Sequence, residues 1–221
     1  MADLIDAAVQ RVKNEADWVL AQFPANHKPP QGYLHALGAM AWTMGKVSAP
    51  NEGWRKSHGL PVPSGGVEKI AEEAVHWESG ICGASEVVLE IVLKRIGYET
   101  RQIQVFTPDR ASVLTHVHGA GGHTFVEVKY GGAGVNVWRM FDATWGMYWH
   151  RNGTFVGDVL STTEVIQLKP GQIDVTHILS EGYYWTRMTK DLRASSGNGL
   201  DWYLWNHLEI WAPRDLLVFK K

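Results

Sequence analysis

The chain of 221 residues contains a single cysteine, and this scarcity excludes two kinds of architecture. One thiol cannot form a disulfide within the chain, and it cannot supply a cysteine-rich zinc site. An excess of charge of one sign is also lacking, because 21 lysines and arginines stand against 23 aspartates and glutamates. We therefore expect no nucleic-acid partner, since binding to phosphates relies on a basic surplus.

Long hydrophobic runs are absent as well. No stretch reaches the roughly 18 apolar residues that a membrane crossing requires, and charged residues interrupt the first 23 positions, so no signal-peptide core is visible. We expect a cytoplasmic protein with no membrane partner, and the sequence leaves its oligomeric state open. Tryptophan is plentiful instead, with 11 residues, and 45% of the chain is hydrophobic, enough for one domain with a large core.

Apolar periodicity predicts that the first part of the chain is helical. Spacings of three and four indicate helices over 3–23, 33–46, 67–77 and 82–96. The last of these is apolar on more than one face, which is typical of a helix buried in the centre of a domain. Gly97 directly follows this helix, and glycine commonly ends helices at their C-terminus. The segment 48–66 contains three prolines and four glycines and predicts a long loop.

After residue 97 the hydrophobic period changes to two, which is the period of strands. We predict strands over 101–106, 123–130 and 135–144, β-prone runs at 155–156 and 165–168, and a helical stretch near 176–193. The fold class is therefore α+β, with one domain over 1–221. Within it, 1–76 is an N-terminal helical part and loop, 77–149 is the core, and 150–221 completes the fold.

A tight hairpin is predicted where four small residues, 131–134, separate two strands. If these four residues form the turn, Tyr130 pairs with Val135, and His123 lies directly opposite Asp142. Side chains at directly opposed positions share a face, with Cβ atoms about 4.5–5.5 Å apart. An imidazole and a carboxylate at that separation can form a hydrogen bond that fixes the tautomer and raises the basicity of the ring. A cross-strand contact without a catalytic role is the alternative.

The lone cysteine, Cys82, stands at the start of the buried helix. The positive end of the helix dipole and unpaired N–H groups favour a thiolate there and can stabilise an oxyanion. Gly83 allows a substrate carbonyl to approach closely. A small buried cysteine without a role is the alternative. A His–Asp pair on a neighbouring sheet would supply the base and the orienting group that such a thiol needs.

Three segments between residues 80 and 149, about a third of the chain, resemble the transglutaminase-like superfamily of papain-like cysteine enzymes. The segments are GICGAS at 80–85, GHTFVEV at 122–128 and FDATWG at 141–146. The resemblance implies a papain/transglutaminase-like core in which a central buried helix packs on an antiparallel sheet. It also implies that Cys82 is the nucleophile, that His123 is the general base and acid, and that Asp142 orients His123.

The resemblance further implies a cysteine peptidase or amidase, or an acyltransferase, that works through a thioester at an amide or peptide bond. The expected substrate is a peptide, a protein or a small amide, and no cofactor or metal is expected. Three residues are candidates for the oxyanion site or the substrate cleft: Gly83, Trp77 and Trp145. Trp149 is a further candidate for shielding the site or lining a cleft. The family usually has tryptophan where Phe125 stands, and the segments 1–76 and 150–221 lie outside the resemblance.

Two other interpretations stay open at this point. His116, His118 and His123, with Glu127 four residues on, echo a cupin-like metal site on strands. That interpretation leaves Cys82 and the predicted partner of His123 without a role. The second alternative is a catalytically inactive binding module, in which tryptophans form an aromatic cleft, as Trp202, Trp205 and Trp211 could.

Overall fold

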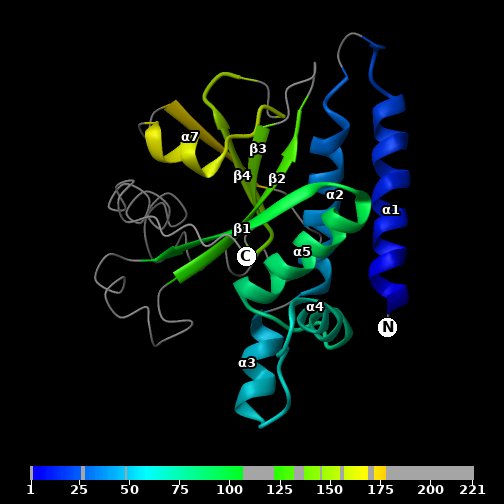
Figure 1. Cartoon of the computed structure of the whole chain (residues 1–221), viewed down its shortest axis with the longest axis vertical. Helices are drawn as coiled ribbons and strands as arrows, with labels where there is room; N and C mark the ends of the chain where they lie inside the picture. The colour runs from blue at the N-terminus through cyan, green and yellow to red at the C-terminus, as the bar shows by residue number, and fades with distance from the viewer. Residues whose placement is uncertain are drawn as a thin grey trace.

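The computed structural model describes residues 2–25, 28–47, 49–106, 122–131, 137–144, 146–154, 157–168 and 172–177. Helices precede a sheet along the chain, so the predicted α+β class is confirmed (Figure 1). The elements are, in order, α1 (Ala2–Ala21), α2 (Gln31–Lys46), α3 (Ala49–Ser57), α4 (Val67–His76), α5 (Cys82–Ile96), β1 (Glu99–Phe106), β2 (Gly122–Tyr130), β3 (Val137–Asp142), β4 (Met147–Arg151), α7 (Thr162–Gln167) and β5 (Ile173–His177).

The five described strands form one antiparallel sheet in the order β1-β2-β3-β4-β5. Each strand therefore pairs with its neighbours in the chain. Beyond the two residue pairs that join β3 to β4, the backbone of Leu160 lies between these strands. The Met140 N–H donates to the Leu160 carbonyl (2.9 Å), and the Leu160 N–H donates to the Trp149 carbonyl (2.7 Å). These bonds bring the start of α7 onto the sheet.

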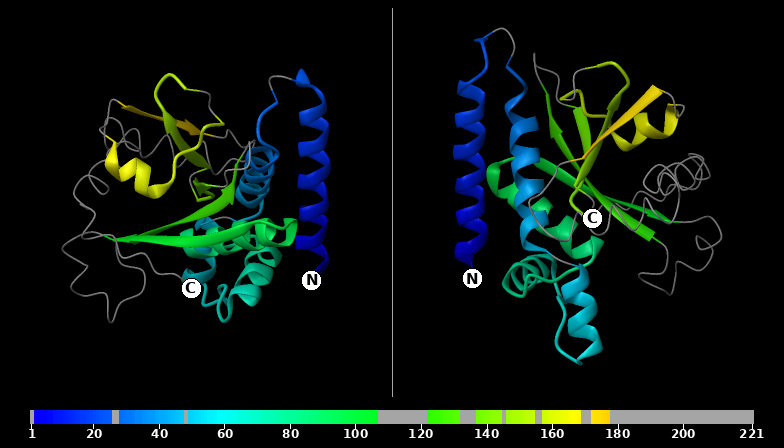
Figure 2. Two further views of the ribbon diagram at one scale, coloured as in Figure 1. Left: turned by 45° about the horizontal axis from the view of Figure 1, so that its top comes forward. Right: turned by 180° about the vertical axis from the view of Figure 1, so that it is seen from behind.

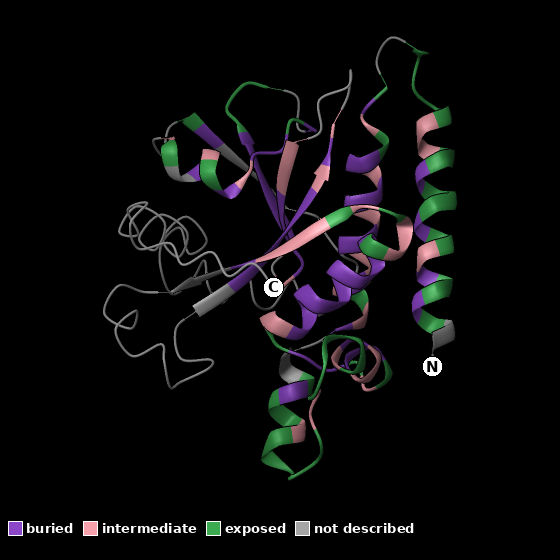
Figure 3. Cartoon of the chain, in the orientation of Figure 1, coloured by how far each residue is buried: buried purple, intermediate pink, exposed green. Residues whose placement is uncertain are grey.

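Helix α5 lies at the centre of the fold. It contacts α1, α2 and α4 on one side and β1 and β2 on the other. Figure 2 shows α1 and α2 side by side on one flank of the molecule and the sheet with α7 on the other. The ten residues from 84 to 93 are all buried, whereas α1 is exposed along its outer side (Figure 3). Gly97, with φ 118°, ends α5 in the left-handed conformation, so the bounds predicted for this helix are confirmed.

The helices predicted over 3–23, 33–46 and 67–77 are confirmed as α1, α2 and α4, but the prediction of a loop over 48–66 is partly wrong. Residues 49–57 form α3. Pro50 stands in its first turn, where the missing N–H of proline disrupts no helical bond. An ion pair one turn apart, Lys56 Nζ to Glu52 Oε1 at 2.5 Å, supports the helix.

The prediction of a β-prone run at 165–168 is also wrong, because 165–167 belong to α7. A capping box starts that helix: the Ser161 side chain accepts the Glu164 N–H, and the Glu164 carboxylate accepts the Ser161 N–H. The helical stretch predicted near 176–193 is wrong at its start, since 173–177 form β5. The rest of that stretch, and the run at 155–156, lie outside the described residues.

The register predicted for the hairpin of β2 and β3 is wrong by two residues. Tyr130 pairs with Val137, so six residues, not four, separate the paired positions. Continuing this pairing places Asp142 opposite Phe125 instead of opposite His123. Two residues is the period of a strand, so His123 and Asp142 still share a face. They are diagonal neighbours, and such positions lie about 7–8 Å apart.

Candidate active site at the start of helix α5

Cys82 is the first residue of α5, and its side chain is partly exposed. Ile81, at the N-cap, is extended and provides no side-chain cap. The N–H groups of Ala84 and Ser85 donate to the Ile81 carbonyl at 2.9 and 3.0 Å. Among the described residues, the N–H groups of Cys82 and Gly83 have no acceptor. Two backbone donors therefore flank the thiol, as an oxyanion site requires.

The loop that leads from α4 into Cys82 is held in a restricted conformation. Glu78 adopts a positive φ of 48°, which is uncommon for a residue with a side chain. Ser79 is fully buried. A Cβ atom on Gly80 would lie 2.5 Å from the Ala84 Cβ and 2.8 Å from a Val47 methyl group, so only glycine fits there. The loop therefore fixes the entry of the chain into α5.

Helix α3 anchors the same loop from outside. The Glu52 carboxylate, which is only 5% exposed, accepts the Ile81 N–H at 2.8 Å. The Asn51 side-chain amide donates to the Glu78 carbonyl at 2.8 Å. Sequence reasoning missed both residues because it assigned 48–66 to a loop. They hold the backbone on the N-terminal side of the candidate nucleophile.

Replacement of Gly80 by alanine should lower the free energy of unfolding by about 1–3 kcal/mol, the usual cost of overpacking a tight site. Gly83→Ala is the matched control, because a Cβ atom at Gly83 would meet nothing within 4 Å and alanine favours the helix. Urea unfolding of both variants measures the difference. Equal stability of the two variants would show that the loop relaxes around the added methyl group.

Asp142 lies at the same end of the sheet as the start of α5. Its side chain is fully buried, and one carboxylate oxygen accepts the Thr144 N–H at 2.9 Å. Glu86, one turn after Cys82, accepts the Ala143 N–H at 2.9 Å, and it accepts both the N–H and the hydroxyl of Thr144 at 3.2 Å. Glu86 thus ties the turn that follows Asp142 to the first turns of α5. Sequence reasoning missed this residue.

His123 is the second residue of β2 and pairs with Val105 of β1. Its side chain lies outside the described part of the structure. In β2, Val126 and Val128 belong to the core around α5, so by strand alternation His123 and Asp142 are on the opposite face. The thiol of Cys82 can therefore meet them only around the end of the sheet, where β2 begins and β3 ends.

The candidate cleft residues have different environments. A Cβ atom at Gly83 would meet nothing within 4 Å, so the space beside it is open. That a substrate approaches there stays a prediction. Trp77 ends α4 and is half-buried, and the Arg55 guanidinium lies over its ring at 4.4 Å from the centroid. Trp149 is 1% exposed and packs edge-on against Phe125, so it does not line an open cleft; that it shields the site stays a prediction. Trp145 lies outside the described residues.

The described residues contain no group of three or more histidine, cysteine, aspartate and glutamate side chains that could hold a metal ion. The side chains of His116, His118 and His123 lie outside them, as do Trp202, Trp205 and Trp211. Glu127, the carboxylate of the cupin-like interpretation, is fully buried and otherwise engaged. It accepts the Arg101 Nε–H at 2.7 Å and the Thr162 N–H at 2.7 Å. Within the same part of the chain, no helix has the length and apolar character that a membrane crossing requires.

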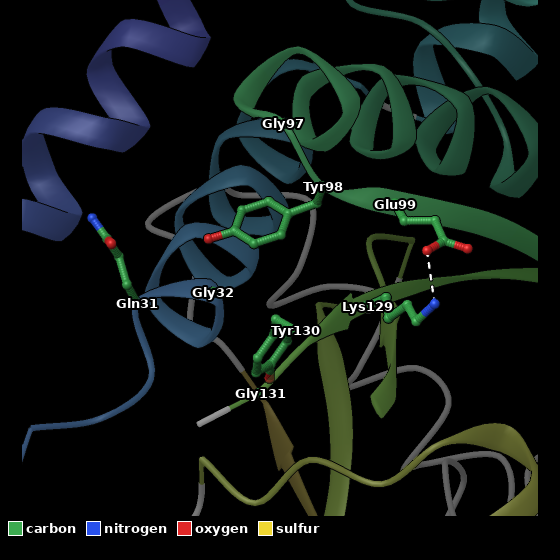
Figure 4. A pocket seen from close by; sticks show the side chains of 8 residues that line it. All are labelled: Gln31, Gly32, Gly97, Tyr98, Glu99, Lys129, Tyr130 and Gly131. Carbon is green, nitrogen blue, oxygen red and sulfur yellow. Dashed lines mark hydrogen bonds and ion pairs between the residues drawn. The ribbon is translucent and has the colours of Figure 1, made fainter. Parts of the chain in front are cut away.

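A cavity of about 480 Å³ lies at the other end of α5 (Figure 4). The Lys129 ammonium and the Glu99 carboxylate neutralise each other at its side, 2.8 Å apart. The Tyr98 hydroxyl is 2.8 Å from His35 Nδ1; burial lowers the pKa of His35 and raises the pKa of Tyr98. Burial favours the neutral forms of His35 and Tyr98, and Lys129 is paired with Glu99, so none of these four groups is an activated nucleophile. Its lining residues are Gln31, Gly32, Gly97, Tyr98, Glu99, Lys129, Tyr130 and Gly131.

In comparisons with known proteins, no family model, no curated protein and no solved structure matches the chain. The functional interpretation therefore depends on the residues and the geometry at the start of α5.

Proposed function

We propose that the chain is a transglutaminase-like cysteine enzyme with a papain-like core, which transfers or hydrolyses acyl groups at an amide or peptide bond. One observation carries the proposal. Cys82 starts the central helix beside two N–H groups without acceptors among the described residues, and Glu86, one turn later, hydrogen-bonds the turn that follows the buried Asp142. A nucleophile, an oxyanion site and an orienting carboxylate are the groups that acyl transfer needs close together.

In the proposed reaction, His123 takes the proton of the Cys82 thiol, and the thiolate attacks the substrate carbonyl carbon. The carbonyl electrons move to oxygen, and the N–H groups of Cys82 and Gly83 hydrogen-bond the oxyanion. Collapse of this intermediate breaks the bond to the amine, which leaves with the proton from His123. A thioester on Cys82 results. Water, or an acceptor amine in the transferase case, then attacks it while His123 again acts as base.

Two carboxylates give the proposed site its rigidity. Asp142, which is buried and held by the Thr144 N–H, would orient the His123 ring and stabilise its protonated form. Glu86 acts indirectly: its hydrogen bonds hold the turn beside Asp142 against the helix that contains Cys82. The proposed substrate is a peptide, a protein or a small amide. We also propose a cytoplasmic location, where a lone reactive thiol stays reduced.

The formation of a thioester tests the proposal. On mixing with p-nitrophenyl acetate, the protein should release a burst of p-nitrophenol equal to the enzyme concentration and gain the mass of one acetyl group on Cys82. His123→Ala should keep the thiol but slow acylation by about 100-fold or more, the typical contribution of a general base.

His58→Ala is the matched control, since this exposed ring stacks on Trp54 of α3 and plays no part in the proposed site. It should acylate at the rate of the unchanged protein. Acetyl groups spread over lysines with none on Cys82, or equal acylation rates in the two histidine variants, would contradict the proposal.

A further inference from the structure

Arg139, on β3, carries a positive charge that its surroundings compensate poorly. Its side chain is 22% exposed, and the nearest carboxylate oxygen, Glu164 Oε2, is 3.8 Å from Nη1, too far for a hydrogen bond. Within the part of the chain that the structure describes, its buried Nε–H has no partner. A guanidinium has five N–H donors and stays charged, so a mostly buried one is costly unless an anion faces it.

The neighbouring ionic groups are already engaged. The Arg101 Nε–H donates to the buried Glu127 at 2.7 Å, and Lys129 pairs with Glu99 at 2.8 Å. Glu164 is used by the cap of α7, where its Oε2 accepts the N–H and the hydroxyl of Ser161 at 2.9 and 3.0 Å. Arg151 also lies near Glu164, with its Nη2 3.6 Å from Oε1. Among the described residues of this region, Arg139 differs in having a buried Nε–H without a partner.

A cavity of about 440 Å³ opens beside Arg139, between the sheet and the start of α7. The Trp138 ring forms part of its wall, with the Arg101 guanidinium 4.2 Å and the Lys129 ammonium 5.5 Å from the ring centroid. Thr163 adds an exposed hydroxyl. The volume suits a small molecule, and the lining is cationic with hydroxyl donors, which is the chemistry of an anion site.

We propose that this cavity binds a small molecule through a phosphate or carboxylate group, which accepts hydrogen bonds from Arg139 and from the Thr163 hydroxyl. Both groups present several anionic oxygens that match the planar guanidinium. The described residues that line this cavity include none of α5 and none of Cys82, His123 and Asp142. The proposal is therefore independent of the role of Cys82.

Thermal unfolding of the full chain in inorganic phosphate and in citrate, each compared with sodium chloride at equal ionic strength, tests the site. We expect a saturable rise in Tm, because a ligand that binds the folded state stabilises it. Arg139→Gln should weaken the binding at least tenfold. A response to phosphate alone identifies a phosphate-bearing ligand, a response to citrate alone identifies a carboxylate, and a response to both supports the shared chemistry.

Lys69→Gln removes the same charge from an exposed position on α4 and should bind as the unchanged protein does. A second variant, Thr163→Glu, places a carboxylate within the cavity. It should raise Tm without added anion and abolish the gain with phosphate or citrate, even if Arg139→Gln fails to fold. Any of three results would overturn the proposal. The first is that neither anion gives a saturable rise in Tm, and the second is that Arg139→Gln and Lys69→Gln lose anion binding equally. The third is that Thr163→Glu responds to the anions as the unchanged chain does.

Discussion

Replacement of Cys82 by alanine should abolish turnover of activated esters and amides, with kcat/KM lowered by about a thousandfold or more. The chain has no second cysteine to take over the attack. The effect on stability should be small, because Cys82 is partly exposed at the first position of α5 and alanine suits a helix. Steady-state kinetics with p-nitrophenyl acetate and with a small amide measure the loss.

The unfolding midpoint in urea is the companion measurement for this variant. Unchanged stability together with lost turnover assigns the effect to chemistry rather than to folding. If Cys82→Ala kept more than a tenth of the turnover, another group would be the nucleophile, and the proposed reaction would be wrong.

The second large effect is expected at Glu86, which accepts three hydrogen bonds from the turn after Asp142. Glu86→Ala leaves the Ala143 N–H and the Thr144 hydroxyl without their acceptor, while the Thr144 N–H keeps its bond to Asp142. The free energy of unfolding should therefore fall by about 2–4 kcal/mol. The folded protein should also acylate Cys82 at least tenfold more slowly, because the turn beside Asp142 is no longer fastened to α5. Urea unfolding and the acylation burst measure the two effects.

Glu90→Ala is the matched control, one turn further along the same helix. Glu90 is also buried and accepts hydrogen bonds from β1, from Gln102 at 2.9 Å and from Thr100 at 3.4 Å. Within the described residues, none of its hydrogen bonds or ion pairs involves the turn after Asp142. Its loss should destabilise the fold and leave the acylation rate of the folded protein unchanged. Equal acylation rates in the two glutamate variants would show that Glu86 has only a structural role.

The sequence predicted those elements whose structure depends on residues close together in the chain. A run of fifteen residues, apolar on more than one face and followed by Gly97, predicted α5 with its observed bounds. The two-residue alternation in β1 and β2 predicted strands. The face shared by His123 and Asp142 was also predictable, since a shift of two residues preserves it. The register itself was not, because it depends on the connection between Tyr130 and Val137, for which the glycines suggested too short a turn.

Elements that depend on distant contacts were harder to predict. Strand β4 shows no alternation because four of its five residues are buried, so both of its faces are covered. Helix α3 is short and contains proline and glycine, and its role at the site comes from Glu52, which contacts the backbone 29 residues away. Two local patterns in the sequence do point to such features. The Ser161–Glu164 capping box indicates the start of α7, and Glu86 and Glu90, four residues apart in an apolar helix, indicate buried carboxylates with partners.

The rate at which iodoacetamide labels Cys82 at pH 6.5 is the most direct test of the proposal that this thiol is activated. An ordinary thiol, with a pKa of about 8.5, is about 1% thiolate at that pH and reacts slowly. We expect the folded protein to react at least tenfold faster than the chain in urea, with His123→Ala removing most of the advantage. Labelling that occurs only after unfolding would contradict the proposal and assign Cys82 to the inert, structural cysteines.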